Sequence, residues 1–357
     1  DIAFTKFVVN TTADALHIDD WQLLAADTLP FSEQWQARLL HLPRTEALAF
    51  AKTHTYFGHY TAELVNRFLK KQNVDPDFIA AHGHTVFHYP DENMTTQIGD
   101  GAALAALTGY PVISDFRTQD VASGGEGAPL APLADKLLFS EYDFFLNIGG
   151  IINISCNANG KFVAFDITAA NQLLNALALQ LGQAYDAEGA LAAQGDIIER
   201  ALKDAAELPY FSQPYPKSLD NQWVRKHILP FFVHPRRSVE DRLRTSCEHI
   251  AQQTAQALAQ IVKAEKLDDQ KNYQLLTTGG GAFNTFLVQT LQKHCQKILD
   301  IELIVPEKNV VEFKEAILMG LMGVLRLENV PNCLQTVTGA QRNVIGGAVH
   351  QGWKKQV

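Results

Sequence analysis

The segment from Tyr273 to Cys295 constrains the fold most, because an apolar strand pattern there meets three consecutive glycines and then a helical pattern. Gly279, Gly280 and Gly281 allow the backbone to approach a flat or anionic ligand closely. The start of the following helix offers unpaired N–H groups and the positive end of its dipole. A tight turn between strand and helix is the alternative, but three glycines exceed what such a turn needs. We therefore interpret the segment as a nucleotide contact.

The rest of the chain alternates in the same way between short strands and longer helices. Strand patterns fall at residues 1–10, 78–81, 111–114, 144–147, 151–155, 162–165, 273–276 and 303–305. Helical patterns fall at residues 31–71, 101–108, 170–205, 238–265, 285–295 and 312–327. This alternation predicts an α/β fold.

The length of 357 residues is typical of two domains. Residues 123–132 are the richest in glycine and proline, and we expect the chain to cross there between a first lobe, 1–132, and a second, 133–329. The segment 330–357 is expected to pack back on the first lobe. A Gly-Gly hairpin over 144–155 and an opening strand like the second half of such a hairpin indicate that the two lobes are similar.

Composition excludes several classes of function. The net charge is −9 and no basic stripe is present, which argues against nucleic acid as the main partner. The four cysteines form no CxxC pair, so reduced thiols are expected rather than a disulfide framework or a zinc site. No run of about 20 apolar residues indicates a membrane span, and no signal peptide opens the sequence. We expect a cytoplasmic protein whose true N-terminus precedes Asp1.

Two further segments are candidates for chemistry. The Asn147-Ile148-Gly149-Gly150 hairpin is either an ordinary β-turn, which we favour on this segment alone, or a second ligand contact. Asp166 follows a strand and precedes a long helix, so it is either a general base at the ligand-binding edge of a sheet or a helix N-cap. The sequence leaves both roles open.

Histidines and an arginine gather nearer the N-terminus. His82, His84 and His88 lie within seven residues, and hydrogen-bonding or packing roles are favoured over metal binding because no further ligand stands nearby. Asp115 and Arg117 form either a structural ion pair or a site at which the arginine holds a substrate carboxylate.

In their joint order, these segments resemble the anhydro-N-acetylmuramic acid kinase family over nearly the whole chain. The matching segments are His82-Gly83-His84-Thr85, Gln97-Ile98-Gly99, Asp115-Phe116-Arg117, Gly124 to Leu130, Asn147 to Gly150, Phe165-Asp166 with Asn171, Pro216-Lys217-Ser218, Gly279 to Gly281 with Asn284, and Glu315-Ala316. The resemblance implies two RNase H-like lobes of the actin/hexokinase type with the active site in the cleft between them. It also implies a cytoplasmic enzyme of cell-wall sugar recycling. Such an enzyme uses ATP, Mg²⁺ and water to open a 1,6-anhydro ring and phosphorylate O6.

The resemblance assigns roles residue by residue. Asp166 matches the catalytic base that activates water. The substrate-binding positions are Gln97, Arg117, Asn171 and Glu315, and Arg117 is expected to pair with the lactyl carboxylate. The ATP-binding positions are Gly149, Gly150, Asp186, Gly189, Gly279, Gly280, Gly281 and Asn284. No metal ligands are assigned, and a homodimer is compatible with the resemblance.

The chain departs from the family pattern at three places. Asp166 to Asn171 keeps the Asp and Asn but lacks the usual Gly-Pro-Gly turn between them, and His84 replaces the usual glutamine. The Gly-Thr-Ser-x-Asp-Gly phosphate loop expected before residue 1 is not in the sequence. Two alternatives stay open. One is a nucleotide-gated binding or chaperone-like ATPase of the same fold, because fold does not fix function. The other is a catalytically weakened sugar-binding relative, which the altered turn after Asp166 and the missing loop suggest.

Overall fold

The computed structural model describes residues 1–11, 16–158, 161–233, 236–268 and 270–354. The chain divides into two compact units. Unit 1 comprises residues 1–139 and 313–357, and unit 2 comprises residues 140–312. Strands and helices alternate in both units, so the predicted α/β class is confirmed.

Unit 2 is built on one five-stranded sheet with the order β11-β10-β7-β8-β9. Its strands are β7 (Phe144–Ile148), β8 (Ile151–Ala158), β9 (Lys161–Ala169), β10 (Tyr273–Thr278) and β11 (Ile301–Ile304). The first three form an antiparallel meander, while β10 runs parallel to both β7 and β11. This order, with only the second strand of the unit antiparallel to the rest, is that of an RNase H-like lobe. The central strand β7 is apolar and buried except at Asn147, as expected of a strand covered on both faces.

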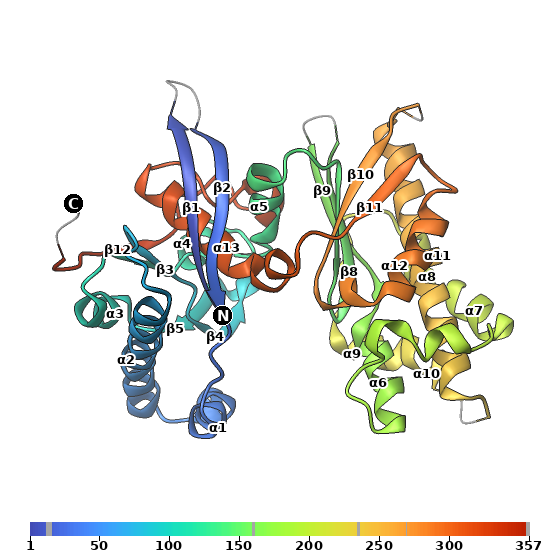
Figure 1. The fold of residues 1–357 in the computed structure, drawn as a ribbon, viewed down its shortest axis with the longest axis horizontal. Coiled ribbons are helices and arrows are strands. Elements are labelled where there is room, and N and C mark those ends of the chain that lie inside the picture. Colours follow the sequence, from blue (N-terminus) through green and yellow to red (C-terminus); the bar gives the residue numbers. More distant parts are fainter. Residues whose placement is uncertain (12–15, 159–160, 234–235, 269, 355–357) are drawn as a thin grey trace. The chain divides into compact units, whose positions relative to one another are not determined.

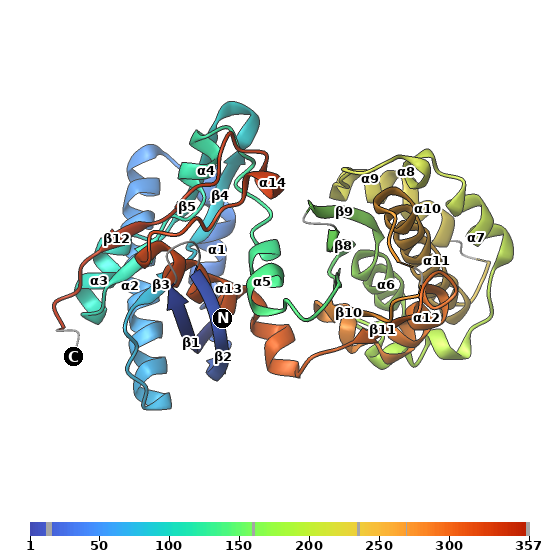
Figure 2. The same cartoon turned by 90° about the horizontal axis from the view of Figure 1, so that it is seen from above.

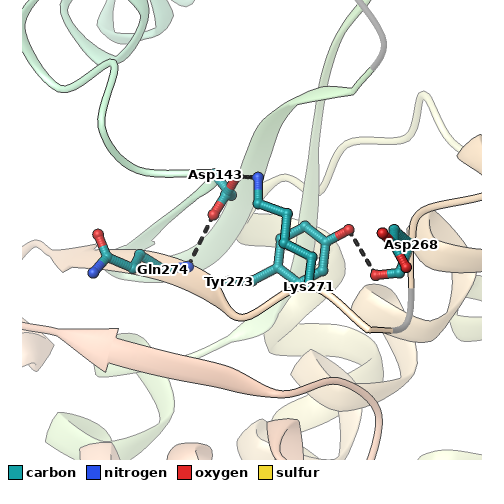
Figure 3. A network of polar contacts seen from close by, with 5 residues as sticks. All are labelled: Asp143, Asp268, Lys271, Tyr273 and Gln274. Carbon is teal, nitrogen blue, oxygen red and sulfur yellow. Dashed lines mark hydrogen bonds and ion pairs between the residues drawn. The ribbon is translucent and has the colours of Figure 1, made fainter.

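A polar network fixes the start of the pairing between β7 and β10 (Figure 3). The Asp143 carboxylate binds the Lys271 ammonium and accepts a hydrogen bond from the backbone N–H of Gln274 at 3.0 Å. Tyr273 donates its hydroxyl to the carbonyl of Asp268 at 2.9 Å, and its ring lies under the Lys271 ammonium. The network sets the register of two parallel strands that are far apart in the sequence.

Helices of unit 2 pack on this sheet and bury one large apolar core (Figure 1). They are α6 (Asn171–Ala178), α7 (Glu199–Ala206), α8 (Pro209–Ser212), α9 (Asn221–Trp223), α10 (Leu229–Phe232), α11 (Val239–Glu265) and α12 (Thr285–Cys295). The helical region predicted over 170–205 is helical only at its two ends. Gly182 and Gly189 adopt positive φ values of 73° and 74° there, and the chain breaks into α6, short 3₁₀ turns and α7.

Unit 1 holds its strands in three smaller sheets. They are β1 (Ile2–Thr11), β2 (Leu16–Asp27), β3 (Ile79–Ala81), β4 (His84–Tyr89), β5 (Met94–Ile98), β6 (Val112–Ser114) and β12 (Ala348–His350). β1 pairs antiparallel with β2, β4 pairs antiparallel with β5, and the third sheet has the order β12-β6-β3 with β3 parallel to β6. The strands at β1, β3 and β6 were predicted, whereas β2 and the β4–β5 hairpin were not.

The helices of unit 1 surround these sheets (Figures 1 and 2). They are α1 (Glu33–His41), α2 (Ala47–Gln72), α3 (Gly101–Thr108), α4 (Thr118–Ala122), α5 (Ala131–Leu138), α13 (Lys308–Leu327) and α14 (Gln335–Thr338). Residues 308–312, the start of α13, belong to unit 2. The helical region predicted over 31–71 forms two helices, which are separated at Leu42–Arg44 because Pro43 cannot continue the first. Within the described ranges, no helix is both long and apolar enough to cross a bilayer.

Candidate functional site

The three glycines after β10 differ in what the fold requires of them. Gly279 has φ 81°, and a Cβ atom there would lie 2.6 Å from the Asn147 side chain. A Cβ on Gly281 would collide with a methyl group of Ile148. Gly280 is exposed, and its nearest neighbour would be the Asn171 amide at 3.8 Å. A tight turn therefore explains two of the glycines, and the third leaves open backbone that a ligand can approach.

The Gly149-Gly150 turn lies against the start of α6. The carbonyl of Gly149 accepts the N–H of Asn171 at 3.0 Å, and the carbonyl of Gly150 accepts those of Ala170 and Gln172 at 2.8 and 3.2 Å. The Asn171 side chain also donates to the carbonyl of Ile148 at 3.1 Å. Asn171 therefore bonds to this turn and lies close to the one after β10, and the N–H groups that open α6 are already bonded.

Asp186, Gly189 and Asn284 also come together. The buried Asp186 carboxylate accepts the N–H groups of Leu191 and Ala192 at 2.9 and 3.0 Å. The resulting turn presses Gly189 against Asn284, where a Cβ would collide with the side-chain oxygen. Asn284 caps α12 by accepting the N–H of Leu287 at 2.9 Å. The predicted ATP-binding positions thus gather around the glycine-rich turn of unit 2.

Asp166 lies inside β9 and does not cap the next helix, whose N-cap is Ala170. Its carboxylate accepts the N–H of Leu219 at 2.9 Å. Burial raises the pKa of Asp166, and the hydrogen bond from Leu219 opposes that rise. A carboxylate with a raised pKa, oriented by one backbone N–H, is suited to accept a proton.

The segment 209–219 holds Asp166 in place, and no pattern in the sequence indicated this contact. Tyr210 donates its hydroxyl to the Asp166 carbonyl at 2.7 Å, and the Asp166 N–H donates to the carbonyl of Lys217 at 3.1 Å. The Lys217 ammonium lies over the rings of Tyr210 and Phe165, 4.8 and 5.6 Å from their centroids. Burial lowers the pKa of Lys217. The backbone N–H and C=O groups of Asp166 are therefore both bonded to the segment 209–219.

In unit 1, Arg117 forms the centre of a second polar group. Its Nε donates to His82 Nε2 at 2.9 Å, and one terminal nitrogen donates to the carbonyl of Gly127 at 2.6 Å. His82 Nε2 therefore accepts and carries no proton. Burial and the charge of Arg117 lower the pKa of His82. The Glu315 charge acts on both side chains, and Glu315 and Arg117 line the same cavity of unit 1. Asp115 does not pair with Arg117 but accepts the Thr118 hydroxyl at 2.5 Å.

Gln97 is presented by the β4–β5 hairpin. Its amide nitrogen donates to Thr95 at 2.9 Å and to Thr85 at 3.3 Å. Its buried carbonyl oxygen has no hydrogen-bond partner among the described residues. His88 also contacts Thr95, at 3.0 Å, and a Cβ on Gly127 would lie 3.5 Å from His88 and 3.6 Å from Arg117. The structure thus places the β4–β5 hairpin close to Arg117. In the sequence, only the order of the segments that match the family suggested this proximity.

The three histidines near the N-terminus make separate contacts. His82 bonds to Arg117, His88 bonds to Thr95, and His84 packs beside the Phe57 ring with centroids 6.3 Å apart. Over the ranges that the structure describes, no three His, Cys, Asp or Glu side chains are grouped to hold a metal ion.

The RNase H-like sheet of unit 2, with glycine-rich turns at its strand ends and a half-buried aspartate in β9, defines an α/β protein of the class that includes sugar kinases. The family model described as anhydro-N-acetylmuramic acid kinase matches residues 8–352, and the chain belongs to this family. The protein of this name from Mannheimia succiniciproducens is 31% identical over 376 residues, covering 98% of this chain and 94% of the relative. Its counterpart from Pseudomonas syringae pv. tomato is 34% identical over 352 residues, covering 93% of each.

A solved structure, the activator of the 2-hydroxyisocaproyl-CoA dehydratase from Clostridium difficile with bound ADPNP, aligns at 14% identity. It covers 56% of this chain and 66% of its own, with a TM-score of 0.34, and adds nothing to the assignment.

Proposed function

We propose that this protein is an ATP-dependent hydrolytic kinase of cell-wall sugar recycling in the cytoplasm. It opens the 1,6-anhydro ring of anhydro-N-acetylmuramic acid and phosphorylates O6. The observation that carries the proposal is the match of the family model over residues 8–352. The geometry within each unit supports separate roles for the residues in proton transfer, nucleotide binding and sugar binding.

Asp166 is the base. It takes a proton from water while the water oxygen attacks the anomeric carbon and the bond from that carbon to O6 breaks. O6 then attacks the γ-phosphorus of ATP, and ADP leaves. A positioned carboxylate typically contributes about 10²–10⁴-fold to such a proton transfer. The bonds from Leu219 and Tyr210 support this role, since they fix the carboxylate and the backbone on which it stands.

The nucleotide lies against the turn of Gly279 to Asn284, where exposed Gly280 permits close approach. Gly149 and Gly150 form the second phosphate contact. Mg²⁺ usually keeps several waters and takes one or two carboxylates in addition to phosphate oxygens. When bound, the ion would supply charge neutralisation during phosphoryl transfer.

The sugar is recognised mainly by unit 1. Arg117 pairs with the lactyl carboxylate, using the donors left after its bonds to His82 and Gly127. Gln97, presented by the β4–β5 hairpin, contributes a further polar contact to the sugar. Glu315 accepts a sugar hydroxyl. Asn171 of unit 2 is a further substrate-binding position.

The proposal is tested by incubating the protein with Mg-ATP and a panel of amino sugars and weighing the products. The expected product is heavier than the anhydro sugar by one phosphate and one water. A gain of phosphate alone would identify an ordinary hydroxyl kinase. ATP turnover without any sugar product would instead identify the nucleotide-gated ATPase.

A further inference from the structure

Asp120 of α4 is a fully buried carboxylate that takes no part in the proposed proton or phosphoryl transfer. Its Oδ2 accepts the backbone N–H of Gly127 at 2.8 Å, and its Oδ1 accepts the Thr338 hydroxyl at 2.8 Å. Both donors are neutral, and none of the ion pairs among the described residues involves Asp120. A buried carboxylate that meets only neutral donors is costly, so its position needs an explanation other than stability.

Gly127 connects this carboxylate to the polar group around Arg117. Its N–H donates to Asp120, and its carbonyl accepts a terminal nitrogen of Arg117 at 2.6 Å. Gly127 has φ 64°, and a Cβ there would lie 2.7 Å from a methyl group of Val121. Arg117 is itself the N-cap of α4, and its carbonyl accepts the N–H of Val121 at 3.1 Å. The loop that follows α4 therefore returns to the side chain of the residue at which α4 begins.

The segment around α14 contacts the same loop. The Thr338 carbonyl accepts the N–H of Glu126 at 2.7 Å, so this residue bonds both to the loop and to the Asp120 carboxylate. A Cβ on Gly125 would collide with Asp120 and lie 2.8 Å from the Ala340 side chain. The loop is thus closely packed between the carboxylate and the α14 segment, and a movement of Asp120 would displace Gly127 with it.

We propose that Asp120 is a positioning residue for sugar recognition, which acts through Gly127 to hold Arg117 in the orientation that binds a substrate carboxylate. Thr338 in turn fixes the Asp120 side chain. The inference rests on the proposed function, in which Arg117 meets the lactyl carboxylate.

The physical reason lies in the two anchors of the guanidinium group, His82 and the Gly127 carbonyl. The second anchor is only as rigid as the Gly127 peptide, whose N–H is bonded to Asp120. A charged acceptor holds such an N–H roughly twice as strongly as a neutral one. A guanidinium fixed before binding loses less conformational freedom when the sugar binds.

Substitutions at both ends of this chain of contacts test the proposal. Asp120→Ala removes both acceptors, whereas Asp120→Asn keeps one oxygen for the Gly127 N–H. Thr338→Val removes only the hydroxyl. Thr108→Val is its matched control, because Thr108 is also buried in unit 1 and also donates to the carbonyl four residues before it, but it is not bonded to a carboxylate.

The first measurement needs no substrate. NMR of labelled protein follows the exchange of the Arg117 Nε–H, which is bonded to His82. We expect exchange at least about tenfold faster in Asp120→Ala, because a bonded group exchanges only on opening. Asp120→Asn and Thr338→Val should show smaller increases, and Thr108→Val should keep the wild-type rate.

Unchanged exchange in Asp120→Ala, or equal changes in Thr338→Val and Thr108→Val, overturns the proposal. If Asp120→Ala does not fold, Asp120→Asn and Thr338→Val decide the question in the same way. Exchange in both at the wild-type rate then overturns the link from Asp120 to Arg117.

The second measurement compares KM with kcat. For the anhydro-muramic substrate, we expect KM to rise about tenfold in Asp120→Ala while kcat hardly changes, the effect of one weakened charge-assisted hydrogen bond. For an anhydro amino sugar without the lactyl group, KM should stay the same. An equal rise for both sugars, or a fall in kcat alone, overturns the positioning role. A wild-type protein that phosphorylates neither sugar contradicts the proposed function, whereas the exchange of Arg117 still confirms or overturns the link from Asp120.

Discussion

The two units repeat one plan of helix and strand before they diverge. Helix α2 has 26 residues and α11 has 27, and each ends at a left-handed residue with φ 52° and ψ 51°, Asn73 and Lys266. In each case the next N–H bonds back to the last helical turn, from Val74 to Leu69 and from Leu267 to Val262. A short loop then leads into β3 or β10.

The units differ in the connection that leaves this strand. After β10 the chain enters the glycine turn and α12 directly. After β3 it passes His82 and Gly83, inserts the β4–β5 hairpin and only then forms α3. The same scaffold thus presents open backbone in unit 2 and polar side chains in unit 1. The connection after a repeated strand, rather than the scaffold, therefore sets the chemistry of each unit.

If unit 2 performs the chemistry, the largest effect follows from Asp166→Asn. We expect turnover to fall about 10²–10⁴-fold, because the amide cannot take the proton from water. Nucleotide affinity, measured by calorimetry, stays unchanged, and the melting temperature does not fall, since burial already disfavours the charged carboxylate. Asp204→Asn, at a half-buried position of α7 where the carboxylate pairs with Arg200, is the matched control. Retained turnover in Asp166→Asn would remove this residue from the mechanism.

If unit 1 recognises the sugar, Arg117→Lys should act on substrate binding. The lysine keeps the charge but not the fork that reaches His82, Gly127 and a carboxylate together. We expect KM for the muramic substrate to rise about 10–100-fold, the worth of a charge-assisted hydrogen bond. The comparison uses an anhydro amino sugar without the lactyl group, for which KM should hardly change. An equal rise for both sugars would argue against the carboxylate contact.

Substitutions of Gly279 and Gly280 test whether the turn after β10 requires glycine for packing or for ligand binding. Gly279→Ala should destabilise the protein by about 1–3 kcal/mol, because an alanine is strained at a positive φ and its Cβ atom would collide with Asn147 and Ile148. Gly280→Ala meets only the Asn171 amide, at 3.8 Å, and should leave stability unchanged while weakening nucleotide binding. Thermal melts with and without ATP measure both effects. If Gly280→Ala binds ATP normally, the turn has a structural role alone.

The smallest expected effect concerns the acid stability of unit 2. His249 is fully buried between the rings of Phe211 and Phe232, and burial lowers its pKa to about 3. An unfolded histidine titrates near a pH of about 6.5. As the pH falls, the unfolded state therefore binds the proton before the folded state does. The stability that comes from burying neutral His249 is complete above about pH 6.5 and is lost as the pH falls toward 3.

Between about pH 6.5 and pH 5 the loss should be roughly 1–2 kcal/mol. Hydrogen exchange of β8 and β9, compared with that of β6 in unit 1, measures it. His249→Leu should flatten the dependence in unit 2 and leave that of unit 1 as it was. An unaltered slope in the variant would assign the acid sensitivity to other groups.

Local patterns in the sequence were sufficient for the features that a few neighbouring residues encode. The strand–glycine–helix run of 273–295 predicted β10, its turn and α12, because apolar periodicity and glycine act over short distances along the chain. The α/β class and the family followed from the order of such segments. The same patterns placed Asp166 at a strand but could not separate a base from an N-cap, because both depend on where the next helix begins.

Features that depend on distant partners emerged only in the folded chain. β2 exists because β1 pairs with it, although Asp19 and Asp20 interrupt its apolar pattern. Asp166 is held by Tyr210 and Leu219, which are 44 and 53 residues away, and by no near neighbour that a pattern could reveal. Periodicity reports which face of an element is apolar, whereas the tertiary structure decides which polar groups meet at its ends.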